Sequence, residues 1–373
     1  MAGTGENVGE VDRALRRTMR KPTRLRRHLF PSRSEIAIHH YARASTSPGY
    51  VRKRRRFGSK LLIDTRPKPS VSSATMHIPS GMMNGAVCPV TAAVAATGIA
   101  GAAWAAARSE HKPDAVKFAS VSALVFAGQM MNFPISSGTS GHLLGGVLAA
   151  ALLGTPFGVL AVALVLGVQC LLFSDGGLAV LGANVLNMSL IGAGIGGLIA
   201  GRLRDRSVGS LARLSFAAWA SVVLAAIVCS LELALSGAVP FSLCAPAMLG
   251  THAVIGVGEA LITVLAFSLL AAPATDSRKS ALVPAAAAVL IALVLSPFAC
   301  GFPDGLESVA KKLGFLHASA PAFVAPLADY SLPVSLPAPV STGLAGLVGV
   351  LAVFALGSVI SLSWRSLRRV RIS

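Results

Sequence analysis

Charged residues are scarce in this 373-residue chain, in which Asp, Glu, Lys and Arg together make up 13% of the residues. A soluble domain carries roughly 25%. Aromatic residues are also few, at 6%, whereas hydrophobic residues account for 54%. The mean hydropathy is +0.69. A chain with so little charge cannot cover a water-soluble surface, and the composition predicts an all-α polytopic membrane protein.

Several motifs that carry chemistry are absent as well. The sequence has no G-x-x-x-x-G-K-[ST] nucleotide-binding motif, no H-E-x-x-H metalloprotease motif and no C-x-x-C pair. Most of the five cysteines lie in apolar runs, where small residues pack between helices. We therefore expect neither disulfides nor a zinc site. We also expect no ATPase activity in this chain itself, and no enzyme activity.

Positive charge is concentrated in residues 1–75, which hold 18 of the 33 Lys and Arg but only 5 of the 15 Asp and Glu. Blocks of like charge, such as Arg52–Arg56, do not pack into a core. Three interpretations stay open. The segment is sequence added by a wrongly chosen start codon, a targeting peptide removed near Met76, or a cytoplasmic arm that binds acidic lipid. We expect a disordered extension outside the fold, and no nucleic-acid partner.

Apolar runs recur from Ala86 onward with short breaks. They predict nine helices, near 86–107, 115–131, 142–153, 156–173, 185–201, 214–235, 247–271, 282–299 and 341–363. The third is too short to cross a hydrocarbon layer of about 30 Å. We expect this helix to be broken or re-entrant around Gly154–Pro156.

The loops between these helices differ in charge. Lys and Arg occur in the loops at 108–117, 202–213 and 278–279 and in the end at 365–371, whereas those at 132–141, 174–184 and 236–246 have none. Cytoplasmic loops are the ones enriched in Lys and Arg. Nine spans with Met76 outside and Ser373 in the cytoplasm fit this alternation. The pattern predicts a multi-pass protein of the bacterial inner membrane.

The stretch Met76–Gly81 has a chemistry that makes sense at the start of a chain. If Met76 is the first residue, its free α-amine, the His77 backbone nitrogen and the His77 imidazole close two chelate rings around one metal ion. A fourth nitrogen from a distant histidine completes a square, which nickel(II) and copper(II) favour. Inside a continuous chain the Met76 nitrogen is an amide and the first ligand is lost. The alternative is a chance Met-His pair.

Polar residues at membrane depth are costly and usually functional. In this chain they gather at the outer ends of predicted helices, in loops without positive charge, as Gln129, Asn132, His142, Asp175, Asn184 and Asn187. His252 and Glu259 are seven residues apart and share one face of a helix, as a polar path or as a structural pair. A ligating imidazole needs its other nitrogen hydrogen-bonded, and these side chains are candidates for such support.

Six ordered motifs carry a resemblance to a known family: Met76–Pro79, Asn132–Ile135, Gly138–Gly146, Leu172–Gly177, Gly182–Met188 and His252–Thr263. They resemble the substrate-specific membrane component of energy-coupling-factor nickel/cobalt transporters, the CbiM/NikM family. The resemblance implies a metal-binding domain of about seven helices at 76–275. It also implies that Met76, His77 and His142 hold the metal, while the Asn-Phe-Pro and Asp-Gly-Gly loops hold the N-terminal segment. Ser80 departs from the family, which often has an acidic residue there.

The C-terminal part resembles a second family. Residues 301–307, which include Pro303-Asp304-Gly305-Leu306-Glu307, and residues 326–330 look like the PDGLE module that accompanies these transporters as an auxiliary N component. The resemblance implies a module at 276–373 with two helices and an outer loop at 300–340.

Together the resemblances imply the substrate-capture component of an ATP-driven importer with a metal site on the outer face. Its substrate is nickel(II) or cobalt(II), with the fused module favouring nickel slightly, and it has no cofactor. Its partners are a transmembrane coupling subunit, two cytoplasmic ATPases and membrane lipid. Two alternatives stay open: an intramembrane metalloenzyme using His77, His142, His252 and Glu259, and a metal sensor without a transport role.

Overall fold

The computed structural model describes residues 77–136, 138–203, 206–271, 277–316 and 325–369. Met76 and the basic extension 1–75 lie outside the described residues. The regular secondary structure of the described residues is helical, apart from one two-stranded hairpin. Seven of its helical segments are long and apolar enough to cross a membrane. The prediction of an all-α polytopic membrane protein is confirmed.

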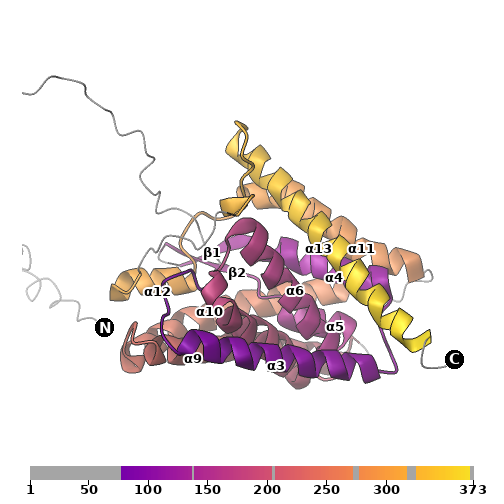
Figure 1. The fold of residues 1–373 in the computed structure, drawn as a ribbon, viewed down its shortest axis with the longest axis horizontal. Helices are drawn as coiled ribbons and strands as arrows, with labels where there is room; N and C mark the ends of the chain where they lie inside the picture. Colours follow the sequence, from indigo (N-terminus) through magenta and orange to yellow (C-terminus); the bar gives the residue numbers. More distant parts are fainter. Residues whose placement is uncertain (1–76, 137, 204–205, 272–276, 317–324, 370–373) are drawn as a thin grey trace, which may run out of the picture. The chain divides into compact units, whose positions relative to one another are not determined.

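Each of the nine predicted helices has a counterpart (Figure 1). The first part of the chain forms α3 (Val87–Arg108), α4 (Ala115–Gln129), α5 (Gly146–Leu153) and α6 (Thr155–Phe173). One continuous span follows, made of η1 (Leu178–Val180), α7 (Leu181–Asn184), the π-helical η2 (Val185–Ile195) and α8 (Gly196–Ala200). Next come α9 (Val208–Leu235), α10 (Phe241–Leu270), and α11 (Ser277–Leu290) continued by η3 (Ile291–Leu295) and η4 (Ser296–Phe298). The chain continues with α12 (Gly305–Leu313), η5 (Ala328–Tyr330) and α13 (Ala338–Arg369).

Helix α4 lies at the centre of the packing. Its residues from Phe118 to Gln129 are all buried, and it contacts α5, α6, α11 and α13. Figure 1 shows α13 running beside α11 and across α4. The C-terminal helices therefore pack directly against the core formed by the first part of the chain.

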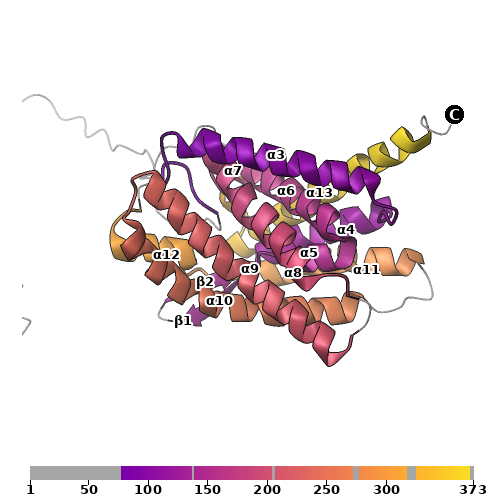
Figure 2. The ribbon, with the colours of Figure 1, turned by 90° about the horizontal axis from the view of Figure 1, so that it is seen from below.

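The remaining long helices pair with one another. Helix α3 packs against α6 and α7, and α9 packs against α10 along their length (Figure 2). Helices α9 and α10 each begin six residues before the predicted starts at 214 and 247. Pro246 lies inside α10 near its N-terminus, so it did not mark the start of that helix.

The third predicted helix is wrong at its beginning. Residues 142–145 are not helical, because β1 (Asn132–Ser136) and β2 (Thr139–His142) form an antiparallel hairpin. Helix α5 begins only after Gly145, which has a left-handed backbone. The non-helical segment is stabilised by other parts of the protein, which is the condition for such backbone at membrane depth.

The predicted break at the end of this helix is confirmed. Helix α5 is eight residues long and ends at Gly154, where φ is 95° and α6 begins directly. Eight residues rise only about 12 Å. Leu153 and Gly154 nevertheless line one cavity with Arg108 and Arg202. The hairpin and α5 together therefore reach the end of the bundle that carries the Arg-bearing loops.

Helix α5 lies between α6 and η2 at very short distances. A Cβ atom on Gly158 would be 2.6 Å from the Ala150 nitrogen, and one on Gly146 would be 2.6 Å from the Ala193 nitrogen. Only glycine allows the backbones to approach this closely, as small residues do in membrane helix pairs.

The predicted outer loop at 300–340 contains a helix that the sequence analysis missed. Helix α12 is amphipathic, with Leu306, Val309 and Ala310 buried and Lys311 and Lys312 exposed. Its nine residues are too few to have produced a membrane-span signal.

Candidate metal centre

The first described residues lie in the protein interior. The His77 and Ile78 residues are each 3% exposed. Asn184 of α7 contacts the Ile78 backbone twice: its Oδ1 accepts the Ile78 N–H at 3.0 Å, and its Nδ2 donates to the Ile78 carbonyl at 3.3 Å. The Gly177 N–H donates to the same carbonyl at 3.1 Å. These contacts fix the segment that follows Met76.

The Asp-Gly-Gly loop allows the segment to lie this close. A Cβ atom on Gly177 would be 2.6 Å from the Ser80 nitrogen and 2.5 Å from its Oγ. A larger residue at this position would push the segment away. Ser80, the departure from the family pattern, therefore packs against the loop.

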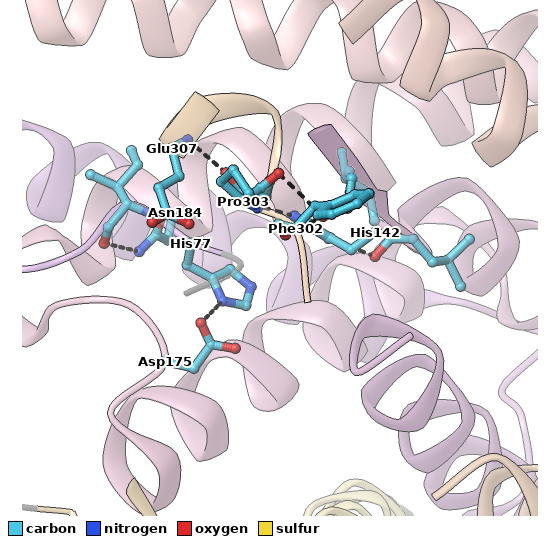
Figure 3. Close-up of polar contacts among 12 residues, drawn as sticks. His77, His142, Asp175, Asn184, Phe302, Pro303 and Glu307 are labelled. Atoms are coloured by element: carbon cyan, nitrogen blue, oxygen red, sulfur yellow. Dashed lines mark hydrogen bonds and ion pairs between the residues drawn. The ribbon is translucent and has the colours of Figure 1, made fainter. Parts of the chain in front are cut away.

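Gln169, Tyr330 and Asp175 form a chain of polar contacts that ends at His77. Asp175 Oδ1 lies 2.8 Å from His77 Nδ1 (Figure 3). The Tyr330 hydroxyl donates to Asp175 Oδ2 at 2.7 Å, and Gln169 Nε2 donates to the Tyr330 oxygen at 3.2 Å. The Tyr330 ring stacks on Phe173 with centroids 4.6 Å apart. Asp175 thus has a fixed position beside His77.

His142 ends strand β2 and faces His77. The two ring centroids are 5.9 Å apart, and Figure 3 shows both side chains in the same region. In the hairpin register His142 pairs with the buried Asn132. His142 Nδ1 lies 3.2 Å from the Leu143 carbonyl oxygen. Protonation at Nδ1 satisfies this contact and leaves the Nε2 lone pair for a metal.

Two buried polar side chains hold the loop after His142. Glu259 of α10 accepts the Leu144 N–H at 2.6 Å and the Gly145 N–H at 2.9 Å. Gln129 of α4 donates its Nε2 to the Leu144 carbonyl at 2.8 Å. Both side chains are fully buried. They fix the backbone of the loop and do not contact the His142 ring.

The two histidines line a cavity of about 80 Å³. A water molecule needs about 10–15 Å³ of such space, so the cavity holds several. Its polar lining residues are His77, His142, Asn184, Asn187, His252 and Asp304, and most of the others are apolar. A small hydrated ion fits a cavity of this size and lining.

His252 and Asn187 take positions at the edge of this site. His252 Nδ1 lies 2.8 Å from the Met248 carbonyl oxygen of its own helix. Asn187 Nδ2 donates to Glu232 Oε2 at 2.7 Å. Both residues line the cavity, whereas Glu259 bonds elsewhere. His252 and Glu259, predicted to share a face, therefore have separate partners.

Burial and neighbouring charge change the protonation of the site. Burial, together with the nearby His77, lowers the pKa of His142 to about 4. Burial raises the pKa of Asp304 to about 7, against the Glu307 N–H, which lowers it. Burial also tends to raise the pKa of Asp175, but the contacts with His77 and Tyr330 outweigh it and the pKa is lowered. Asp175 is therefore anionic and His142 neutral at pH 7.

Two residues at this site were not predicted from the sequence. Asp304 Oδ2 lies 4.0 Å from His142 Nε2, and Tyr330 contacts Asp175. Both belong to the stretches that resemble the PDGLE module, which carried a fold expectation and no site role. No sequence pattern links positions this far apart.

The structure brings the rings of His77 and His142 to within 5.9 Å of each other and places Asn132, Asp175, Asn184 and Asn187 close to them. Met76 lies outside the described residues. Within the described ranges, no three His, Cys, Asp or Glu side chains form a group that could hold a metal ion.

Comparison with known families matches residues 77–277 to the cobalt uptake substrate-specific transmembrane region, CbiM, and residues 278–366 to the PDGLE domain. A protein of Archaeoglobus fulgidus with the provisional name fused nickel transport protein NikMN is 39% identical over 251 residues, which are 64% of this chain and 83% of that protein. The fused nickel transport protein NikMN of Rhodobacter capsulatus is 31% identical over 214 residues, 50% of this chain and 59% of that protein. The cobalt transport protein CbiM of Sorangium cellulosum is 34% identical over 164 residues, which are 42% of this chain and 72% of that protein.

Proposed function

Because the chain belongs to the cobalt uptake substrate-specific transmembrane family and carries a fused PDGLE domain, we propose that it captures nickel(II) or cobalt(II) for import. The observation that carries the proposal is the buried His77–Ile78 segment facing His142. Both residues are 3% exposed, and the Ile78 N–H and carbonyl are held by Asn184 and Gly177. The names of the relatives agree with a transporter subunit and not with an enzyme.

The proposed ligands are the Met76 amine, the His77 backbone nitrogen, the His77 imidazole and the imidazole of His142. The chelate ring through the His77 backbone uses Nδ1, which in this structure faces Asp175. Closing the chelate therefore requires the imidazole to turn away from Asp175. Four nitrogens in one plane suit nickel(II), and the same set also accepts cobalt(II).

The test of the ligand set is a chain that begins at Met76, compared with one that carries ten additional residues before Met76. The extension turns the Met76 amine into an amide, leaves every side chain from Met76 onward unchanged, and is long enough that the new terminal amine cannot close a small chelate with His77. We expect the first chain to bind nickel tightly, with a d–d absorption band of planar nickel, and the extended chain to lose the band. Equal binding by both chains would rule out the amine as a ligand.

The proposed orientation places the metal site on the outer face of the bacterial inner membrane and the C-terminus in the cytoplasm. The Arg residues of two loops, Arg108 and Arg202, line one cavity, at the end of α3 opposite His77. Positive residues at one end support this orientation.

The energy for import has to come from partner subunits, because the sequence has no nucleotide-binding motif. We propose a transmembrane coupling subunit and cytoplasmic ATPases as those partners, reached through the Arg-bearing end of the bundle. A metal sensor without a transport role is separated from this function by uptake of radioactive nickel. Cells producing the chain with its partners accumulate the ion if it is a transporter component, and do not if it is a sensor.

A further inference from the structure

The PDGLE domain forms one wall of the cavity that holds the proposed site. Asp304 and Leu306 line the cavity together with His77 and His142. Asp304 is the one carboxylate among the described lining residues. The second domain therefore contributes a buried carboxylate to the cavity wall.

The segment that carries Asp304 is bonded firmly to the hairpin that carries His142. The Ser140 N–H donates to the Pro303 carbonyl at 2.9 Å, and the Ser140 hydroxyl donates to the Phe302 carbonyl at 2.8 Å (Figure 3). The hydroxyl groups of Thr139 and Ser308 lie 2.8 Å apart. Hydrogen bonds before and after Asp304 in the chain therefore fix its position relative to His142.

Helix α12 is seated closely at the same place. A Cβ atom on Gly305 would be 2.6 Å from the Ile255 side chain and 3.0 Å from the His252 ring. Glycine at this position lets the start of the helix approach α10. On the far side of the site, the Tyr330 hydroxyl bonds to Asp175. The PDGLE domain thus touches the site at two separate points.

The two oxygens of Asp304 have different surroundings. Oδ1 accepts the Glu307 N–H at 2.7 Å and caps α12. Oδ2 lies 4.0 Å from His142 Nε2, too far for a hydrogen bond. Bonds from a first-row dication to nitrogen or oxygen are about 2.0–2.2 Å long. An ion between these two atoms is within bonding distance of both.

We propose that Asp304 is an entry ligand, which receives the hydrated dication together with His142 and passes it to the N-terminal chelate. The inference rests on the proposed function. In a square of four nitrogens, the position opposite His142 belongs to the His77 backbone nitrogen, because that nitrogen is the middle donor of the chelate. Asp304 occupies this side first, and leaves the ion as the chelate closes. The PDGLE domain is in this way part of the metal site.

The test measures nickel binding by stopped flow, on the mature chain purified from membranes, with aqueous nickel chloride as the probe. Asp304→Asn removes the charge and keeps the helix cap, since Asn caps as well as Asp. The control is Glu307→Gln in the same helix, whose side chain pairs with Lys311. Thermal unfolding checks that both variants fold like the wild type.

We expect the association rate of Asp304→Asn to fall at least tenfold, with the dissociation rate within threefold of the wild type, and both rates of Glu307→Gln to stay unchanged. A merely structural role would raise the dissociation rate instead. The inference would be overturned if the association rate of Asp304→Asn were unchanged, or if only its dissociation rate changed. Failure of the wild type itself to bind nickel would instead refute the proposed function.

Discussion

At the scale of single residues, the site combines side chains that face the cavity with side chains that hold the backbone. His77 and His142 face each other across 5.9 Å between ring centroids. The hydrogen bonds of Asn184 and Glu259 go to backbone groups of the segments that carry these histidines, and Asn184 also lines the cavity. The sequence predicted all four as site residues, His77 from its place beside Met76 and the other three from their polarity at membrane depth. It did not predict which segment Asn184 and Glu259 hold, because those partners are far apart in the chain.

Glu259→Gln tests the support of the His142 loop. A Gln amide has one acceptor oxygen, so it leaves the Leu144 or Gly145 N–H unpaired, at a cost of about 1–3 kcal/mol in the free energy of unfolding. We expect the nickel Kd to rise about tenfold because the loop shifts. Calorimetric titration and thermal unfolding measure the two effects. Glu232→Gln is the control, since it can still accept from Asn187; a similar loss of affinity there would count against the specific role of Glu259.

Acid is expected to weaken metal binding through the chelate. Burial lowers the pKa of His142 to about 4, so this residue stays neutral and available at all pH values above that. The Met76 amine and the His77 backbone amide each release a proton to the solvent when they bind the ion. For each proton released, the nickel Kd rises about tenfold when the pH falls by one unit. Titration between pH 5 and 8 in buffers of different ionisation enthalpy counts the protons, and a Kd independent of pH contradicts the chelate.

At the scale of elements, the long helices were predictable and the hairpin was not. Apolar runs fix the existence of α3, α6 and α9, because a membrane span leaves a long signal in the sequence. Strands β1 and β2 pair with each other, but they are only four to five residues long. The segment at 300–303, more than 150 residues away, hydrogen-bonds to both of them. A hairpin this short, supported by a segment this distant, leaves no clear local pattern, so residues 142–145 were assigned to a helix.

Gly177→Ala tests the contact between the Asp-Gly-Gly loop and the N-terminal segment. The added Cβ would be 2.6 Å from the Ser80 nitrogen, so the segment has to move and the Gly177–Ile78 hydrogen bond is lost. We expect the nickel Kd to rise at least tenfold, by the loss of a bond worth about 1 kcal/mol and the added strain. Gly167→Ala in α6 is the matched control, because nothing lies within 4 Å of its Cβ position. Titration with nickel measures the affinities of both variants. Equal affinities would show that the Asp-Gly-Gly loop does not support metal binding.

At the scale of the whole molecule, the two family domains share one core and one site. Helices α11 and α13 pack on α4, and Tyr330 and Asp304 reach residues of the first domain. The sequence predicted two adjacent modules, with the outer loop at 300–340 inside the second. It did not predict their shared site, because the contacts join the hairpin and the Asp175 loop to residues over 150 positions later.

The intact mass and N-terminal sequence of the protein purified from its native host are the most direct test of the proposed metal site. A metal site built on the Met76 amine predicts a mature chain that begins at Met76. A chain that begins at Met1 and still binds nickel with planar geometry would contradict it, and the site would have to be rebuilt around His77 and His142 alone.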